Sequence, residues 1–145
     1  MTVITASRYH DISCGHRVYG QGGKCEHLHG HNYRVHFEVE AEESIDCPLD
    51  DVGRVLDFSV IKSKLCMWLE EFWDHKFLIW DNDPWAKLLA GIDPEVVWVD
   101  FNPTAENMGE HLVRVVGPSQ LAGTGCVLVR VMIEETAKCS ATVSL

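Results

Sequence analysis

Apolar and polar residues alternate most clearly between residues 31 and 40, in the segment HNYRVHFEVE. A period of two is typical of a strand that places one face in the core and the other toward solvent. A weaker alternation near the N-terminus predicts a preceding strand. The apolar face of the main strand comprises Tyr33, Val35, Phe37 and Val39.

Residues 41–54 form a polar connection, in which Pro48 and Gly53 are typical of a hairpin-like turn. A short return strand is expected at residues 54–56. From Asp57 the apolar residues recur every three or four positions, which predicts a helix capped by Asp57 or Ser59. Its apolar face would comprise Ile61, Leu65, Trp68, Leu69 and Phe72.

The second half of the chain predicts one further helix between two strands. Residues 79–94 are rich in Asp, Asn, Pro and Gly, so a loop with at most one short helical turn is expected there, before a strand at 95–101. Thr104 is a good N-cap for the second helix, which Gly117 and Pro118 would end. The apolar faces would comprise Met108, Leu112, Val115 and Val116 in this helix, and Val127, Val129, Val131 and Ile133 in a last strand.

This order of elements, with hairpins and no repeated βαβ unit, favours an α+β fold. The length of 145 residues, of which 46% are hydrophobic and 23% charged, fits a single globular domain over residues 1–145. The formal net charge of -10 argues against nucleic acid and anionic membranes as partners, since these require clustered Lys and Arg. A small-molecule substrate is expected, and a local basic or metal-bearing pocket could still bind a phosphorylated one.

The chain has six cysteines, which could form disulfides in an oxidising compartment. Its N-terminus, however, lacks the charged, apolar and small-residue zones of a secretory signal. Free thiols and a cytoplasmic location are therefore expected. The apolar runs are far shorter than the roughly 20 residues that span a bilayer, so no membrane-spanning segment is predicted.

The strongest local signal is KCEHLHGHNY, in which Cys25, His27, His29 and His31 recur at every second residue. In an extended chain these side chains would share one face. Zinc binds imidazole nitrogen and thiolate sulfur, and catalytic zinc sites use three protein ligands with an open position. His16 is the best candidate for a further ligand, because a Gly-rich turn follows it. Spacing does not decide whether His27 is a ligand, nor whether Cys25 closes a structural site or acts beside the metal, and any single histidine could be an ordinary surface or core residue.

Two further groups could carry chemistry. Asp74 and His75 stand at the end of the first predicted helix, where a carboxylate-oriented imidazole could move protons. The alternative is a histidine that only interacts with the helix dipole. Glu135 extends the apolar face of the last strand, where a carboxylate needs a partner, such as the donor edge of a ligand, unless it reaches water.

Together these segments resemble the 6-pyruvoyl-tetrahydropterin synthase and 6-carboxy-tetrahydropterin synthase family. The resemblance covers most of the chain, from CGHRV to IEETAKC. Its motifs stand here as His16-Arg17, Cys25, His29-Gly30-His31-Asn32, Asp57-Phe58, Asp74-His75, Pro103-Thr104-Ala105-Glu106-Asn107 and Glu135-Thr136.

The resemblance implies a set of ligands and a base. Zinc would be bound by His16, His29 and His31, and His27 would be outside the ligand set. Cys25 would be the proton acceptor, acting as a thiolate near the metal.

The resemblance also implies the remaining roles at the site. Asp74 and His75 would form the proton relay. Glu135 would hold the 2-amino and ring N–H edge of the pterin, with Thr104 near that pocket. The substrate would be 7,8-dihydroneopterin triphosphate, and zinc would act as a Lewis acid on its side-chain hydroxyls.

The spacing CxxxHGH is similar to that of bacterial 6-carboxy-tetrahydropterin synthases of the queuosine route, which implies a carboxy product with release of acetaldehyde and triphosphate. The alternatives are the 6-pyruvoyl synthase reaction and side-chain cleavage for a folate route. A further hypothesis is that the protein is not an enzyme but a zinc- or pterin-binding assembly module, in which Cys25 closes a four-ligand site. The chain departs from short bacterial members in its segment 81–99 and in an acidic loop near Asp50.

The resemblance implies the tunnelling fold, an antiparallel sheet with two helices packed on one face. In this family trimers close a β-barrel and two trimers stack, so a homo-oligomer, a hexamer built as a dimer of trimers, is expected. Active sites would lie at subunit boundaries.

Overall fold

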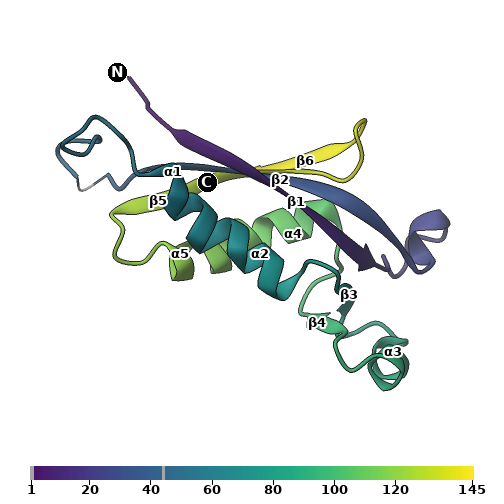
Figure 1. The fold of residues 1–145 in the computed structure, drawn as a ribbon. Helices are drawn as coiled ribbons and strands as arrows, with labels where there is room; N and C mark the ends of the chain where they lie inside the picture. The colour runs from purple at the N-terminus through teal and green to yellow at the C-terminus, as the bar shows by residue number, and fades with distance from the viewer. Residues whose placement is uncertain (1, 44) are drawn as a thin grey trace.

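The computed structural model describes residues 2–43 and 45–145, and its centre is a single six-stranded sheet (Figure 1). The strands are β1 (Ala6–His16), β2 (His29–Ala41), β3 (Phe77–Trp80), β4 (Val97–Val99), β5 (Cys126–Glu134) and β6 (Ser140–Ser144). Their order across the sheet is β4-β3-β1-β2-β5-β6. The expected α+β class is confirmed. The expectation of an antiparallel sheet was wrong in one part: β3 and β4 run parallel to β1, while the other pairs are antiparallel, so the sheet is mixed.

Two composite helices pack on one face of the sheet (Figure 1). The first joins α1 (Phe58–Ile61) and α2 (Met67–Phe72) through a π-helical turn, and the second joins α4 (Ala105–His111) and α5 (Gly117–Gln120) in the same way. The expected caps are confirmed, because the side chain of Asp57 accepts a hydrogen bond from the Ser59 amide and that of Thr104 accepts one from the Asn107 amide. A short helix, α3 (Ala86–Ile92), lies beyond β3.

The core lies between the sheet and these helices. The four apolar residues of β2 are all fully buried, which confirms the alternation expected for this strand. Burying a large apolar side chain contributes about 1.5–3 kcal/mol, so this face anchors the sheet to the helices. The partner side chains from the helices include Ile61, Leu65, Leu69, Met108 and Leu112.

A β-bulge corrects the expected face of β5. Glu38 pairs with Arg130 but Val39 pairs with Leu128, so Val129 is an extra residue in the ladder. Val131 lies in the core as expected. Val127 and Val129 were expected there too, and this was wrong, because the bulge reverses which side chains face inward. Before the bulge the buried residues are Cys126 and Leu128.

Three expected boundaries were also wrong. Residues 54–56 form no strand, because the Asp50 side chain accepts hydrogen bonds from the amides of Val52 and Arg54 and closes a turn. The loop expected at residues 79–94 includes the end of β3 and all of α3, since a short, wholly apolar strand has no period-two signal.

The second helix continues through Gly117 and Pro118 into α5, in contrast to the expected end. The π-helical turn over Leu112–Val116 precedes the proline and accommodates its missing N–H. The wider turn also shifts the apolar face, so Val113 is buried and Val115 is exposed. All six cysteines are free, as expected. No described helix has both the length and the apolar character that crossing a bilayer would require.

Candidate metal centre

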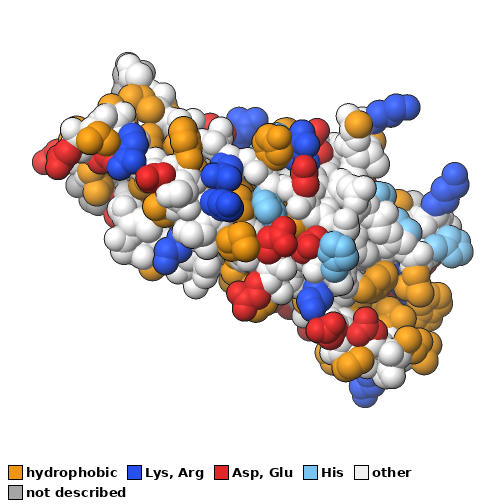
Figure 2. Space-filling model, in the orientation of Figure 1, with side chains coloured by type: hydrophobic (Ala, Val, Ile, Leu, Met, Phe, Trp, Pro, Cys, Tyr) orange, Lys and Arg blue, Asp and Glu red, His pale blue; other side chains and the backbone are white. Residues whose placement is uncertain are grey.

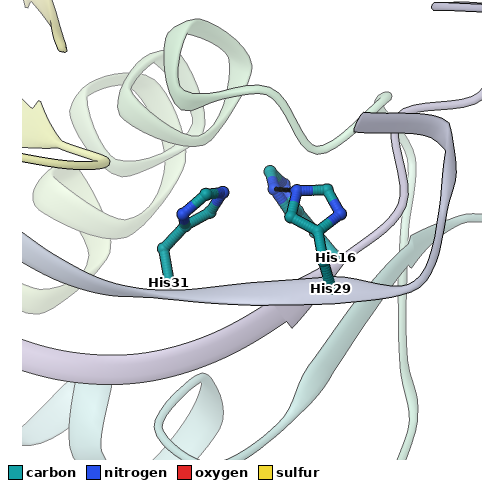
Figure 3. A group of neighbouring side chains, drawn as sticks. All are labelled: His16, His29 and His31. Atoms are coloured by element: carbon teal, nitrogen blue, oxygen red, sulfur yellow. Dashed lines mark hydrogen bonds between the residues drawn. The ribbon is translucent and has the colours of Figure 1, made fainter. Parts of the chain in front are cut away.

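The pairing of β1 with β2 brings three histidines together. In this antiparallel register His16 lies opposite His29, and Cys14 lies opposite His31. Alternate residues share a face, so the three imidazoles point to the side of the sheet that the helices cover (Figure 3). One potential ligand atom from each lies within 4.8 Å of the others. We call His16, His29 and His31 the histidine cluster.

Backbone carbonyls fix the tautomers of two of these imidazoles. His16 Nδ1 lies 2.6 Å from the Pro103 carbonyl, and His29 Nδ1 lies 2.8 Å from the His27 carbonyl. A carbonyl only accepts, so both Nδ1 atoms carry the proton and both Nε2 atoms present a lone pair. Such carbonyl contacts are the usual support of metal-binding histidines.

The Nε2 atoms of the cluster lie as close together as the ligand atoms of one bound cation would. Those of His16 and His29 are 3.0 Å apart (Figure 3). Two lone pairs at that distance repel unless a proton or metal ion lies between them. In the described part of the chain, His31 Nε2 is buried and has no hydrogen-bond partner. Tetrahedral zinc with Zn–N bonds of about 2.0–2.1 Å separates its nitrogens by roughly 3.3 Å, so the cluster fits this ion.

The surroundings favour the neutral form of the cluster. Burial lowers the pKa of His16, and it also lowers the pKa of His31. Neutral imidazole is the form that binds metal. Glu135 follows β5 on the core side, and its Oε1 lies 3.6 Å from His16 Nε2 and 3.7 Å from His31 Nε2. The carboxylate therefore faces the cluster.

The Tyr33 hydroxyl also belongs to the site, although the alternation of β2 predicted Tyr33 only as a core residue. It lies 3.2 Å from His16 Nδ1 and 3.3 Å from His16 Nε2. Burial raises the pKa of Tyr33, so the phenol stays protonated. The sequence did contain one sign of this role: Tyr33 lies two positions after His31 and therefore on the same face of β2.

Cys25 does not lie on the strand face expected from its spacing. It occupies a 3-10 turn at Lys24–Glu26, whereas β2 begins only at His29, so the prediction of one extended face was wrong for Cys25 and His27. Cys25 is half-buried and His27 is exposed. The turn is bound to the end of β1, because the Val18 amide donates to the Cys25 carbonyl over 2.9 Å.

Asp74 and His75 form the expected carboxylate–imidazole pair, with 2.8 Å between Asp74 Oδ2 and His75 Nδ1. The pair is fixed at the edge of β1, where the Ser13 amide donates to Asp74 and the Ser13 carbonyl accepts from the His75 amide. His75 has a positive φ of 58°, an uncommon conformation for a residue with a Cβ. Although burial opposes it, the Ser13 amide and the imidazole hold the pKa of Asp74 below its usual value.

The pair and the histidine cluster belong to opposite faces of the sheet. His75 is strongly exposed and lines a hollow of about 650 Å³ together with outward-facing side chains such as Asn32, Arg34 and Glu134. The cluster lies on the core side. A single chain therefore does not bring His75 into the space that Glu135 and the cluster enclose.

Thr104 lies near the histidine cluster, because the preceding residue, Pro103, is hydrogen-bonded to His16. The Pro103 carbonyl accepts from His16, and Thr104 begins α4 directly after it. The Thr104 hydroxyl accepts from the Asn107 amide over 3.1 Å. Capping leaves the hydroxyl proton free to donate to another group.

Comparisons with known proteins find sequence matches over nearly the whole chain. A sequence model described as 6-pyruvoyl tetrahydropterin synthase matches residues 5–145. A 6-carboxy-5,6,7,8-tetrahydropterin synthase of Rickettsia bellii is 29% identical over 139 residues, which cover 94% of this chain and 97% of the relative. A probable enzyme of the same name from Halobacterium salinarum is 37% identical over 105 residues, 71% of this chain and 63% of the relative.

Solved structures show the same fold. An uncharacterised protein of Wolinella succinogenes superposes with a TM-score of 0.82 at 22% identity, over 99% of both chains. The 6-pyruvoyl tetrahydropterin synthase of Caenorhabditis elegans superposes with a TM-score of 0.69 at 23% identity, over 100% of this chain and 97% of that one.

Proposed function

Since the chain belongs to the 6-pyruvoyl tetrahydropterin synthase family, we propose that it is a zinc-dependent lyase that converts 7,8-dihydroneopterin triphosphate to 6-carboxy-5,6,7,8-tetrahydropterin, releasing acetaldehyde and triphosphate. The observation that carries the proposal is the convergence of three imidazoles beside the Glu135 carboxylate, two of which present an Nε2 lone pair to the others. The names of the bacterial relatives favour the carboxy product. A cytoplasmic setting accords with the free thiols.

His16, His29 and His31 would hold the zinc. When bound, it supplies a Lewis acid for the hydroxyls of the substrate side chain. The three residues come from two paired strands, and the carbonyls of Pro103 and His27 orient two of them before any metal binds. Such preorganisation leaves the fourth position for the substrate.

Glu135 would bind the pterin ring. The ring presents its 2-amino group and an adjacent N–H side by side, and a carboxylate accepts from two such donors at once. Glu135 is 26% exposed, so these hydrogen bonds would form in a largely water-excluded place. The Thr104 hydroxyl could donate to the same ligand.

Cys25 would accept the proton from the substrate side chain, and Asp74 with His75 would relay it. The hydrogen bond to Asp74 keeps the His75 imidazole in one orientation, as a relay requires. Because the pair lies on the outer face of the sheet, we propose that it serves the cluster of a neighbouring copy in a homo-oligomer, a hexamer built as a dimer of trimers.

Surface features support such assembly. The sheet has two open edges, β4 and β6, and open edges favour pairing. Figure 2 shows hydrophobic side chains gathered at the end of the molecule where α3 lies. The exposed large hydrophobic residues of α3 and its N-cap are Trp85, Leu88 and Ile92. Exposed apolar patches of this kind are typical of contact surfaces.

The test is to incubate the zinc-loaded protein with 7,8-dihydroneopterin triphosphate and to identify the products by mass spectrometry. The proposal predicts 6-carboxy-5,6,7,8-tetrahydropterin together with acetaldehyde. A 6-pyruvoyl product, or side-chain cleavage to a folate precursor, would assign the alternative reaction and contradict the proposed one. Unchanged substrate would contradict catalysis.

The alternative hypothesis is that the protein is not an enzyme but a zinc- or pterin-binding module, in which Cys25 is a fourth metal ligand. Cys25 stands outside the group of potential ligand atoms that lie within 4.8 Å of one another, which supports the open site over the closed one. Cobalt substitution distinguishes them. The open site predicts no thiolate charge-transfer band, and a strong band would favour the module.

A further inference from the structure

A buried cation follows the first histidine of the cluster. Arg17 is only 5% exposed, and its Nη1 lies 3.1 Å from Asp83 Oδ1, whose side chain is wholly buried. A charge removed from water in this way is tolerated only with close partners. The partner comes from the segment 81–99, which the proposed chemistry does not use.

The segment also supplies a stacking surface. The Arg17 guanidinium carbon lies 3.6 Å from the centroid of the Trp85 ring, and 5.4 Å from that of Tyr19. Asp83 also accepts from the Trp85 amide over 2.9 Å, so one carboxylate holds both the cation and the stacking residue. A planar guanidinium with a bound carboxylate and a stacked ring has little freedom to rotate.

The other edge of the same guanidinium holds the turn that carries Cys25. Arg17 Nε donates to the Glu26 carbonyl over 3.0 Å. The Glu26 carboxylate in turn accepts from the amides of Gly20 and Gly22, at 3.0 and 3.1 Å, which closes the Gly-rich loop. Cys25, directly before Glu26, is therefore connected through Arg17 to the segment 81–99.

We propose that Arg17 is a positioning residue that holds the Cys25 turn against Asp83 and Trp85. The segment 81–99 then has a role as the support of the thiol. This inference rests on the proposed function only where turnover is measured, because the position of Cys25 can be followed by its alkylation alone. A misplacement of about 1 Å at a reacting group costs roughly 100-fold in rate.

The test compares the full-length zinc-loaded protein with Arg17→Lys, which keeps the charge but loses the planar, forked donor set. Iodoacetamide labelling is followed by mass spectrometry of each cysteine peptide, with exposed Cys47 and Cys139 as internal references. We expect Cys25 to be labelled several-fold faster while the references keep their rates. In turnover assays kcat falls by about 10- to 100-fold with KM and zinc content unchanged.

The matched control is Arg114→Lys, the same replacement in an exposed ion pair with Glu110, and it should alter neither labelling nor kcat. Trp85→Leu removes the ring that stacks on Arg17, while it keeps an apolar side chain on the exposed surface and the backbone amide that donates to Asp83. It tests the inference should Arg17→Lys fail to fold, and a smaller effect in the same direction is expected. Unchanged Cys25 labelling in a folded variant would overturn the inference, as would loss of zinc. If the wild type makes no product but Cys25 labelling still responds, the proposed function fails and the positioning role stands.

Discussion

His16 Nε2 and His29 Nε2 lie 3.0 Å apart while the Nδ1 atom of each ring is engaged by a backbone carbonyl. Both Nε2 atoms are therefore acceptors, and their approach is favourable only around a positive centre. A metal ion between the two imidazoles would supply this positive centre. The metal content of the protein should therefore depend on these two residues.

Replacing His29 with Ala should remove a zinc ligand. Loss of a group that only hydrogen-bonds to a metal ligand already weakens metal binding by about 10- to 100-fold, so loss of a ligand itself should cost at least 100-fold. His27→Ala is the matched control, because the His27 side chain is exposed and only its backbone carbonyl contacts the cluster. Metal analysis after dialysis should find zinc in His27→Ala and little in His29→Ala. Equal zinc loss in both would contradict the assignment.

Replacing Cys25 with Ala should abolish turnover and leave the metal in place. A positioned base contributes about 10²- to 10⁴-fold to the rate, and the thiol stands outside the ligand group. Cys47→Ala, at an exposed cysteine, serves as the control and should keep full activity. Zinc loss in Cys25→Ala would instead indicate that the thiol is a ligand.

Glu135→Gln should weaken substrate binding. The amide has one acceptor oxygen where the carboxylate has two, and hydrogen bonds to a charged group contribute about 1.5–3 kcal/mol, so KM should rise by roughly 10- to 100-fold. Glu110→Gln, at an exposed position on α4, should leave KM unchanged. A wild-type KM for Glu135→Gln would remove the carboxylate from the pterin pocket.

Two inactive variants should complement each other if the relay acts across a subunit boundary. Co-expressed Cys25→Ala and His75→Ala chains would form mixed oligomers, in which some sites combine an intact thiol with an intact relay. Partial activity is expected from the mixture and none from either variant alone. An inactive mixture, with mixing verified by differential tags, would place the thiol and relay of each site in one chain.

A half-buried histidine outside the site should make the fold sensitive to acid. Burial lowers the pKa of His111, against the opposing effect of the Asp100 carboxylate, and its ring packs against Trp73 and Phe101. The folded state thus favours the neutral ring. The unfolded chain takes up a proton as the pH falls through 6.5, so the stabilisation is complete above that pH and is lost below it.

The measurement is urea unfolding of the wild type and of His111→Gln at pH 7.5 and 5.5. Glutamine does not titrate, so the variant should lose less stability between the two pH values, by up to about 1 kcal/mol. The histidine cluster is common to both proteins and cancels in the comparison. Equal losses would show that His111 does not contribute to the acid response.

The sequence allowed prediction of those features that depend on local pattern. The β2 alternation placed His29 and His31 on the face of Tyr33, and the caps at Asp57 and Thr104 located both helices. The Gly-rich turn after His16 made this histidine the candidate third ligand, and the strand register of the structure places it opposite His29. The family resemblance, rather than spacing, separated His27 from the ligands.

The features that escaped prediction depend on contacts between distant residues. The bulge at Val129 is a property of the β2–β5 pair and reverses the face of half a strand. Cys25 was assigned to an extended strand because spacing carries no sign of the 3-10 turn. The role of Arg17 becomes visible only when Asp83, 66 positions later in the chain, lies against it.

Titration of the metal-free protein with zinc tests the central claim most directly. Product formation from 7,8-dihydroneopterin triphosphate should be absent without metal, rise with each addition and level off at about one zinc per chain, as expected for a single three-histidine site. Full activity in the metal-free protein, or stoichiometric zinc binding without any product, would contradict the account.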